Sequence, residues 1–486
     1  MMSKAKKYAI ALFCLLASAS AIPSFSPAVA HANSAPKIWS GGAMADTLFT
    51  SDCPIAVAHE TLVFDVAEYP NNFYRDEAEF LSYDGKVTAE YTFFNPEDYD
   101  ITATLMFPFG TKPEYAYIYS EDGAYISDDR ISQKYDITLD GHAVEKRIRH
   151  SYFPGNVISN FNTRSQLGIM SDGYIEHEFY SPDMTVTEYT YKPEGIVPTQ
   201  NSSPYAAFKL DVDASKTRVA TQWGNGSDLI DDYRYFGYFI DYSGANKIYA
   251  IGEPFPEPLQ WSVFEDGSCK RKIDGSMILT ATETMTLEQF ILGTYDENRS
   301  VSVTDYYNAC IASLDRAKYE DCAYVGGIPE PDELDFMCWY EYEITVPAGS
   351  HAVNTVTAPM YPTIDGDYNP NVYGYTYYLS PAENWAAFGT LDIIVNTPDY
   401  MVQSTLAEFT RGDGCYTASY TSLPVIDLTF HLCAEDIEYP SRAGEIILTV
   451  LIVVAALIFI SPVVGVCIVL IAYAVQQKKR KATPKQ

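Results

Sequence analysis

Basic residues are scarce in this 486-residue sequence, which contains 32 Lys and Arg against 64 Asp and Glu. All of the acids lie between residues 33 and 445, whereas eight of the basic residues lie outside that region. The region therefore has 24 basic residues against 64 acids, a formal charge of −40. A surface of this charge repels nucleic acid and anionic lipid, so we exclude nucleic acid as a partner.

The sequence also lacks the short motifs of common enzymes. It has no G-x-S-x-G nucleophile elbow, no H-E-x-x-H helix, no glycine-rich phosphate loop and no C-x-x-C pair. We therefore predict that the protein is not an enzyme and has no cofactor, apart from the calcium ion considered below. Hydrolysis of glycans stays open as the alternative, because that reaction needs only two well-placed carboxyl groups.

Long apolar runs are confined to the two ends of the chain. The C-terminal run, residues 446–475, has no charged residue and is followed by four basic residues at 478–481. A helix needs about 20 apolar residues to cross a bilayer, so we predict one transmembrane helix over 446–475, kinked at Pro462. The basic tail, 476–486, is then cytoplasmic by the positive-inside rule.

The N-terminal end has the layout of a secretory signal peptide. Three lysines precede the apolar stretch 8–22, and two small-x-small sites follow, ending at Ala30 and Ala32. We predict that residues 1–32 are a cleaved signal. Both ends then give one topology, a bacterial cell-membrane protein with a single span, an extracellular N-terminal domain and a cytoplasmic tail.

The region between the two ends is predicted to be mostly β. It is rich in aromatic residues, and apolar and polar side chains alternate in runs such as 87–93 and 101–109. We expect two or three antiparallel β-sandwich-like domains. The turn residues between runs predict three hairpins, which are 87–93 with 101–109, 135–139 with 144–149, and 235–240 with 247–251.

One amphipathic helix interrupts the β pattern. Ser302 to Asp305 form a capping-box-like start, and the apolar residues that follow fall on one helical face. The Gly- and Pro-rich stretch after the helix marks a domain boundary. We therefore divide the extracellular region into a β-rich part at 33–300, a helix and linker at 301–330, and a β-sandwich at 331–440.

The cysteines outside the signal and the span belong to the part of the chain that we expect to be exported. They can therefore form disulfides, because exported proteins lie in an oxidising compartment. The alternation in 416–420 and 426–432 predicts two strands joined through Leu423-Pro424. If these strands pair, Cys415 lies opposite Cys433 on the outer face. We therefore predict a cross-strand disulfide between Cys415 and Cys433.

Two short motifs suggest binding sites. Asp365, Asp367 and Asn369 place oxygen side chains at alternate positions, a spacing found in calcium loops; an ordinary Asx turn is the alternative. Arg411, Gly412 and Asp413 form a tripeptide of the kind that host-cell integrins bind, in a predicted loop before Cys415.

Two stretches resemble exported bacterial proteins whose function is not established. They are 91–108, which joins an acidic turn to a strand ending in Phe-Pro, and 385–401, with its Trp, Phe-Gly and Asn-Thr-Pro elements. The resemblance implies an envelope β-sandwich and no activity. We thus expect a single-pass cell-surface protein whose acidic, Tyr-rich ectodomain binds a carbohydrate, peptide or protein ligand or forms part of the envelope; the alternative is a membrane-tethered extracellular hydrolase acting on glycans.

Overall fold

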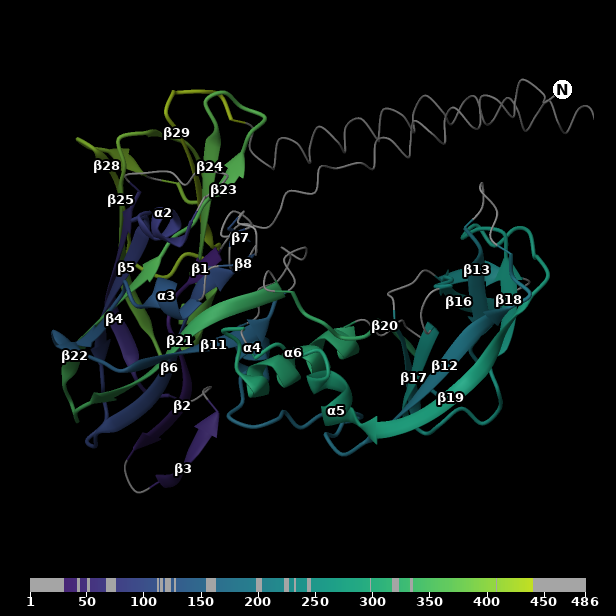
Figure 1. The fold of residues 1–486 in the computed structure, drawn as a ribbon. Helices are drawn as coiled ribbons and strands as arrows, with labels where there is room; N and C mark the ends of the chain where they lie inside the picture. Colours follow the sequence, from purple (N-terminus) through teal and green to yellow (C-terminus); the bar gives the residue numbers. More distant parts are fainter. Residues whose placement is uncertain are drawn as a thin grey trace, which may run out of the picture.

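The structure is a computed structural model of the chain. It describes residues 30–41, 44–49, 53–66, 76–111, 113, 117–118, 124–125, 128–153, 163–197, 203–222, 227–230, 233–242, 246–297, 299–316, 323–332, 335–407 and 409–439. The described part is mostly β with several antiparallel sheets, as the sequence predicts. The strands form two bodies with helices between them (Figure 1).

The first body, here the sandwich body, is built from three sheets around one large apolar core. An eight-stranded sheet has the order β10 (His142–Ala143), β9 (Ile137–Leu139), β22 (His351–Pro359), β5 (Lys86–Phe94), β4 (Ala56–Asp65), β25 (Phe388–Asn396), β28 (Cys415–Tyr420), β27 (Thr410–Arg411). The second sheet has the order β1 (Ala30–Ala32), β24 (Val372–Tyr378), β29 (Leu428–Cys433), β26 (Tyr400–Ser404). The short strand β23 (Thr363–Asp365) also pairs with β24. The third has the order β11 (Lys146–Tyr152), β21 (Phe336–Val346), β6 (Ile101–Thr111), β2 (Ala35–Gly41), β3 (Met44–Phe49).

The second body, here the inserted body, consists of residues between β11 and β21. One of its sheets has the order β19 (Ser276–Thr286), β12 (Thr185–Glu194), β17 (Asn246–Gly252), β14 (Thr217–Thr221), β20 (Tyr324–Gly327). The other has the order β15 (Ser227–Ile230), β16 (Tyr233–Phe239), β13 (Tyr205–Lys209), β18 (Gln260–Phe264). An apolar core with side chains from both sheets joins them face to face. A separate two-stranded ribbon pairs β7 (Tyr117–Ile118) with β8 (Ala124–Tyr125).

The consecutive division into 33–300 and 331–440 is wrong. Strands from the two ends of the chain interleave, because β21 pairs with β6, β22 with β5, and β25 runs parallel to β4. The C-terminal strands therefore complete the sheets of the N-terminal strands, and the middle of the chain is inserted between them. The predicted boundary at 326–331 instead marks the return from the inserted body to the sandwich body.

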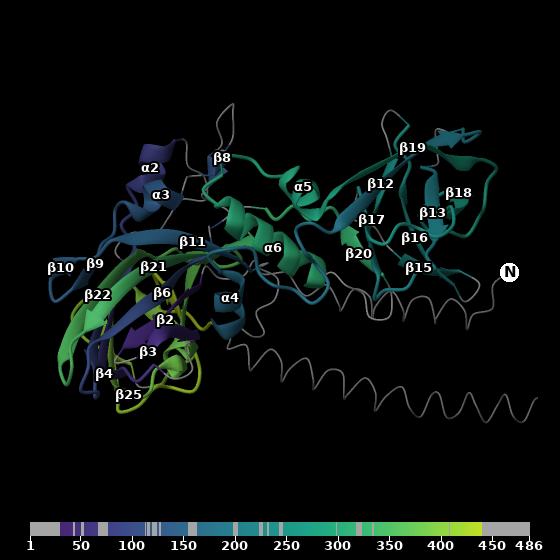
Figure 2. The ribbon, with the colours of Figure 1, turned by 90° about the horizontal axis from the view of Figure 1, so that it is seen from below.

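The longest of the described helices lies where the two bodies meet (Figure 2). The predicted helix is α6 (Val303–Arg316), with the Ser302 hydroxyl accepting from the Asp305 amide. It packs with α5 (Leu287–Leu292) against β12 and β17 of the inserted body, and it also contacts β11 of the sandwich body. The others are short: α2 (Glu77–Leu81), α3 (Asp128–Ser132), α4 (Thr163–Ile169) and the 3-10 turn η3 (Ser380–Asn384).

None of the three predicted hairpins forms as predicted, although the turn of one is present: most of its predicted second strand, 144–149, belongs to β11, which pairs with β21 in another sheet. β9 and β10 pair across Asp140-Gly141, whose φ angles of 50° and 76° fit a type I′ turn. The other two connections, β5 to β6 and β16 to β17, each cross from one sheet to another. Strands that follow one another closely in sequence here face each other across a core instead of pairing.

Buried Asn95 explains why the turn after β5 crosses between sheets. Its amide donates to the carbonyls of Tyr99 (2.8 Å) and Val346 (3.0 Å), and its oxygen accepts from the Glu97 amide (2.9 Å). The side chain thus ties this crossover to the end of β21, where the chain crosses between the same two sheets. Asn95 thus supplies hydrogen-bond partners to backbone groups of both crossovers that would otherwise be buried without any.

The Asn95→Ala variant is therefore expected to lower the free energy of unfolding by about 2–3 kcal/mol, because buried backbone groups lose their partners. Urea unfolding followed by circular dichroism measures the change. Asp98→Ala, an exposed substitution in the same turn, is the matched control and should stay within about 0.5 kcal/mol. Equal effects of the two variants would contradict this role for Asn95.

The predicted signal and anchor fall largely outside the described residues. Of residues 1–32 only 30–32 are described, as β1, and residues 446–475 and 476–486 lie beyond the last described residue. Within the described ranges, no helix is both long enough and apolar enough to span a bilayer. The transmembrane helix and the cytoplasmic tail remain predictions.

Candidate functional site

The predicted Cys415–Cys433 disulfide is wrong. Cys415 begins β28 and pairs with Asn396 of the eight-stranded sheet, whereas Cys433 ends β29 and pairs with Val372 and Tyr400 of another sheet. Both cysteines are free. The error has the same cause as the false hairpins: the connection from β28 to β29 crosses between sheets, so the two strands never pair.

The candidate calcium loop has the geometry of an Asx turn. One carboxylate oxygen of Asp365 accepts from the Asp367 amide (3.0 Å), and the other accepts from the Tyr439 hydroxyl (3.0 Å). Asp367 and Asn369 are exposed. The first of the three proposed ligands is thus occupied by protein donors, which favours the alternative that the sequence left open.

The Arg411-Gly412-Asp413 tripeptide lies in the tight turn between β27 and β28, where all three residues are exposed. The Arg411 guanidinium stacks on Tyr400, 4.1 Å from the ring centroid, a cation–π contact that holds the side chain against the sheet. The loop is accessible as predicted, and adhesion through it remains a prediction.

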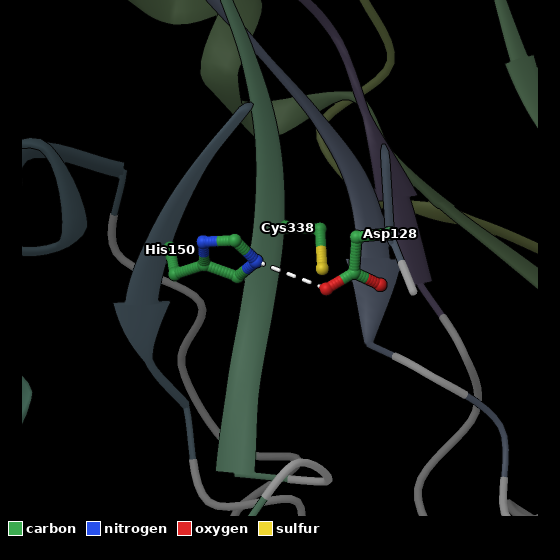
Figure 3. A group of neighbouring side chains, drawn as sticks. All are labelled: Asp128, His150 and Cys338. Atoms are coloured by element: carbon green, nitrogen blue, oxygen red, sulfur yellow. Dashed lines mark hydrogen bonds and ion pairs between the residues drawn. The ribbon is translucent and has the colours of Figure 1, made fainter. Parts of the chain in front are cut away.

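The structure brings together three residues that sequence reasoning missed: Asp128, His150 and Cys338. Asp128 begins α3, His150 lies on β11, and Cys338 lies directly opposite His150 on β21. Each offers a ligand atom, and these atoms all lie within 4.8 Å of one another. Figure 3 shows the Asp128 carboxylate and the Cys338 sulfur close together, facing the imidazole of His150.

The group is enclosed and polar within an apolar setting. His150 Nε2 lies 3.0 Å from Asp128 Oδ2, and the edge of the imidazole packs on the Phe336 ring. His150 is 1% exposed and the other two are 3% exposed. Imidazole, thiolate and carboxylate together are the donor set of zinc sites, so these are the described residues that could hold a metal.

A buried ionic network lies on the other face of the same strands. Arg149, next to His150, donates to both oxygens of Asp305 on α6, at 2.8–3.1 Å, and to Glu341 on β21 at 2.9 Å. Lys37 on β2 also donates to Glu341, at 2.8 Å. Asp305 in turn accepts from the His150 amide (3.1 Å). The network joins the sandwich body to the helix of the inserted body.

An open pocket of about 210 Å³ lies beside this junction. Its lining includes Tyr152, Leu314, the 325–331 segment and Asp335. Burial raises the pKa of Asp335 from its usual value, although the hydrogen bond from the Asp332 amide acts in the opposite direction. The volume is below the roughly 300 Å³ at which drug-sized ligand sites begin, so the pocket would take a small ligand or one end of a larger one.

Comparison with known proteins does not place the chain in a family. No protein-family model matches it, and no curated protein matches its sequence. Four solved chains match in structure. One is a protein of Legionella pneumophila provisionally described as nutrient binding, with a TM-score of 0.32 at 9% identity over 84% of this chain and 71% of that one. A similarity this low supports no conclusion about fold or function.

Proposed function

We propose that the protein is a non-enzymatic, single-pass protein of the bacterial cell surface, and that its ectodomain binds an extended segment of a partner protein through the inserted body. The observation that carries the proposal is the outer strand β19. Seven consecutive residues, 278–284, are exposed, although successive side chains of a strand point to opposite faces. β19 pairs with β12 on one side and ends the order of its sheet in the described part of the chain.

Exposed apolar side chains gather near the start of β19. Of the nine large hydrophobic side chains that are exposed in the described part of the chain, five belong to this end of the inserted body: Val197, Phe239, Tyr242, Ile278 and Leu279. Figure 1 shows this end at the far side from the sandwich body. Glu283 is the only charge on β19, so an apolar strip with an open strand edge stands out on a strongly acidic protein. Open edges of this kind bind extended peptides by β-augmentation.

The Leu279→Lys variant tests this surface, because a lysine on an edge strand opposes pairing with a further strand. The wild-type ectodomain, residues 33–440, is applied to an array of immobilised 15-residue peptides and to a glycan array. We expect binding to a subset of peptides and an at least tenfold weaker signal for Leu279→Lys. The control is Val425→Lys, at a residue of the sandwich body that is 95% exposed, which should bind as wild type does.

Binding that survives Leu279→Lys, or binding to glycans alone, would contradict the proposed surface. Glycan hydrolysis remains a second candidate because the pocket beside α6 contains a carboxyl group of raised pKa, Asp335. Turnover of nitrophenyl glycosides by the wild type, lost in Asp335→Asn, would favour that alternative.

Protease treatment of intact cells tests the proposed location. An external protease should remove the ectodomain of the full-length chain and leave the C-terminal segment with the membrane fraction. An ectodomain that is cleaved only after the cells are lysed would contradict the surface location, whatever the result on the arrays.

A further inference from the structure

The group of Asp128, His150 and Cys338 has no part in the proposed binding surface, yet it combines three chemically active side chains in the interior. We propose that these residues bind one zinc ion, which joins α3 to β11 and β21. His150 and Cys338 are held opposite each other by the strand register, and Asp128 is brought to them by α3. The ligand atoms of all three lie within 4.8 Å of one another, close enough to converge on one ion.

Charge balance favours a divalent ion at this place. As zinc ligands, Asp128 and Cys338 would be a carboxylate and a thiolate, which together carry two negative charges. A bound Zn²⁺ neutralises both while the imidazole stays neutral, so the whole group carries no net charge.

The donor set selects the metal. Calcium and magnesium take oxygen ligands almost exclusively, whereas nitrogen, sulfur and carboxylate oxygen are the ligands of zinc. With three protein ligands, water is the usual fourth ligand of zinc. His150 Nε2 lies 3.0 Å from Asp128 Oδ2, so this nitrogen is the one that faces the other donors.

The alternative use of these residue types, a Cys-His-Asp catalytic triad, does not fit the arrangement. In such a triad the nucleophile and the acid lie on opposite nitrogens of the imidazole. Figure 3 shows the Cys338 sulfur and the Asp128 carboxylate on the same side, toward Nε2. Cys338 is also only 3% exposed, so a substrate could not reach it. Convergence on one nitrogen is the arrangement of metal ligands.

Metal content of the folded ectodomain is the direct test. The wild type, expressed with added zinc and freed of loosely bound metal by gel filtration, should contain about one zinc per chain by mass spectrometry. Cys338→Ser should lose most of it. Cys310→Ser, at another buried cysteine on α6, is the matched control and should retain the ion.

Cobalt substitution keeps the test informative if Cys338→Ser does not fold. The wild type refolded with Co²⁺ should show thiolate-to-cobalt charge-transfer absorption together with the intense visible bands of a four-coordinate ion. The proposal is overturned by a folded wild type without zinc, by Cys338→Ser that retains zinc, or by a cobalt form without the thiolate band.

Discussion

The Glu60→Gln variant is expected to gain stability relative to the wild type as the pH rises. The difference in the free energy of unfolding between the two proteins should shift by about 5 kcal/mol in favour of the variant from pH 4.5 to pH 9. Glu60 lies on β4 inside the core of the sandwich body and is fully buried. Asn33 donates to Oε2 at 3.2 Å, and Oε1 has no hydrogen-bond partner among the described residues. Burial raises the pKa of this carboxyl from 4.5 to about 8, with hydrogen bonds from Asn33 and Tyr91 acting in the opposite direction.

The direction of the pH effect follows from proton binding. Between pH 4.5 and 8 the folded protein keeps the Glu60 proton while the unfolded chain loses it. Stability that is fully present below pH 4.5 is therefore lost as the pH rises toward 8. Each pH unit costs about 1.4 kcal/mol. Glutamine cannot ionise, so the variant escapes this loss and gains relative to the wild type as the pH rises.

Urea unfolding of both proteins at pH 4.5, 7 and 9 measures the effect. The difference in the free energy of unfolding between Glu60→Gln and the wild type should grow from pH 4.5 to 9. Glu343→Gln, at an exposed position of β21, is the control and should give a difference that does not change with pH. A constant difference for Glu60→Gln would show that Glu60 is ionised in the folded protein.

The sequence allowed the strands to be predicted better than their partners. Period-two alternation located β5 and β6, because a half-buried strand must alternate wherever it pairs. The choice of partner depends on which sheet each strand joins after its turn. The turn at Asp140-Gly141 requires positive φ and so enforces a hairpin, whereas the turn at 95–100 holds a crossover through Asn95, whose contact with Val346 spans 251 residues.

The candidate metal site was hidden for the same reason. Local spacing is informative when ligands share a helix or a loop. Asp128 and His150 are 22 residues apart, and Cys338 comes after the whole inserted body. No local pattern singles out His150 on β11 or Cys338 on β21, because both strands carry several other polar residues. Their register, which places His150 opposite Cys338, follows from the interleaved topology that the sequence did not predict.

Replacing Arg149 with methionine is expected to destabilise the protein by about 3–5 kcal/mol, because it leaves a fully buried carboxylate without its cation. Arg149 is 5% exposed and contacts Asp305 through both Nε and Nη2. Burial alone would lower the pKa of Arg149, but the hydrogen bond and charge of Asp305 outweigh it and the pKa is raised. The midpoint of urea unfolding should fall accordingly.

Arg147→Met is the matched control, because Arg147 contacts Glu341 and Asp172 of the same network from a position that is 56% exposed. In this variant Glu341 keeps its contacts with Lys37 and Arg149. A cation exposed to solvent contributes at most about 1 kcal/mol, so the variant should unfold close to the wild type. Equal losses in the two variants would mean that total charge, and not burial, governs the network.

The double variant Arg149→Met/Asp305→Leu separates the worth of the ion pair from the cost of breaking it. Removing both charges leaves no ion stranded in the interior, and well-packed apolar groups often replace a buried pair without loss. We therefore expect the double variant to be more stable than Arg149→Met alone. It would still lose the hydrogen bond that the His150 amide donates to Asp305 (3.1 Å), so recovery should be partial. If the loss in the free energy of unfolding of the double variant equalled the sum of the losses of the two single variants, Arg149 and Asp305 would act independently. The contact between them would then not be what joins the two bodies.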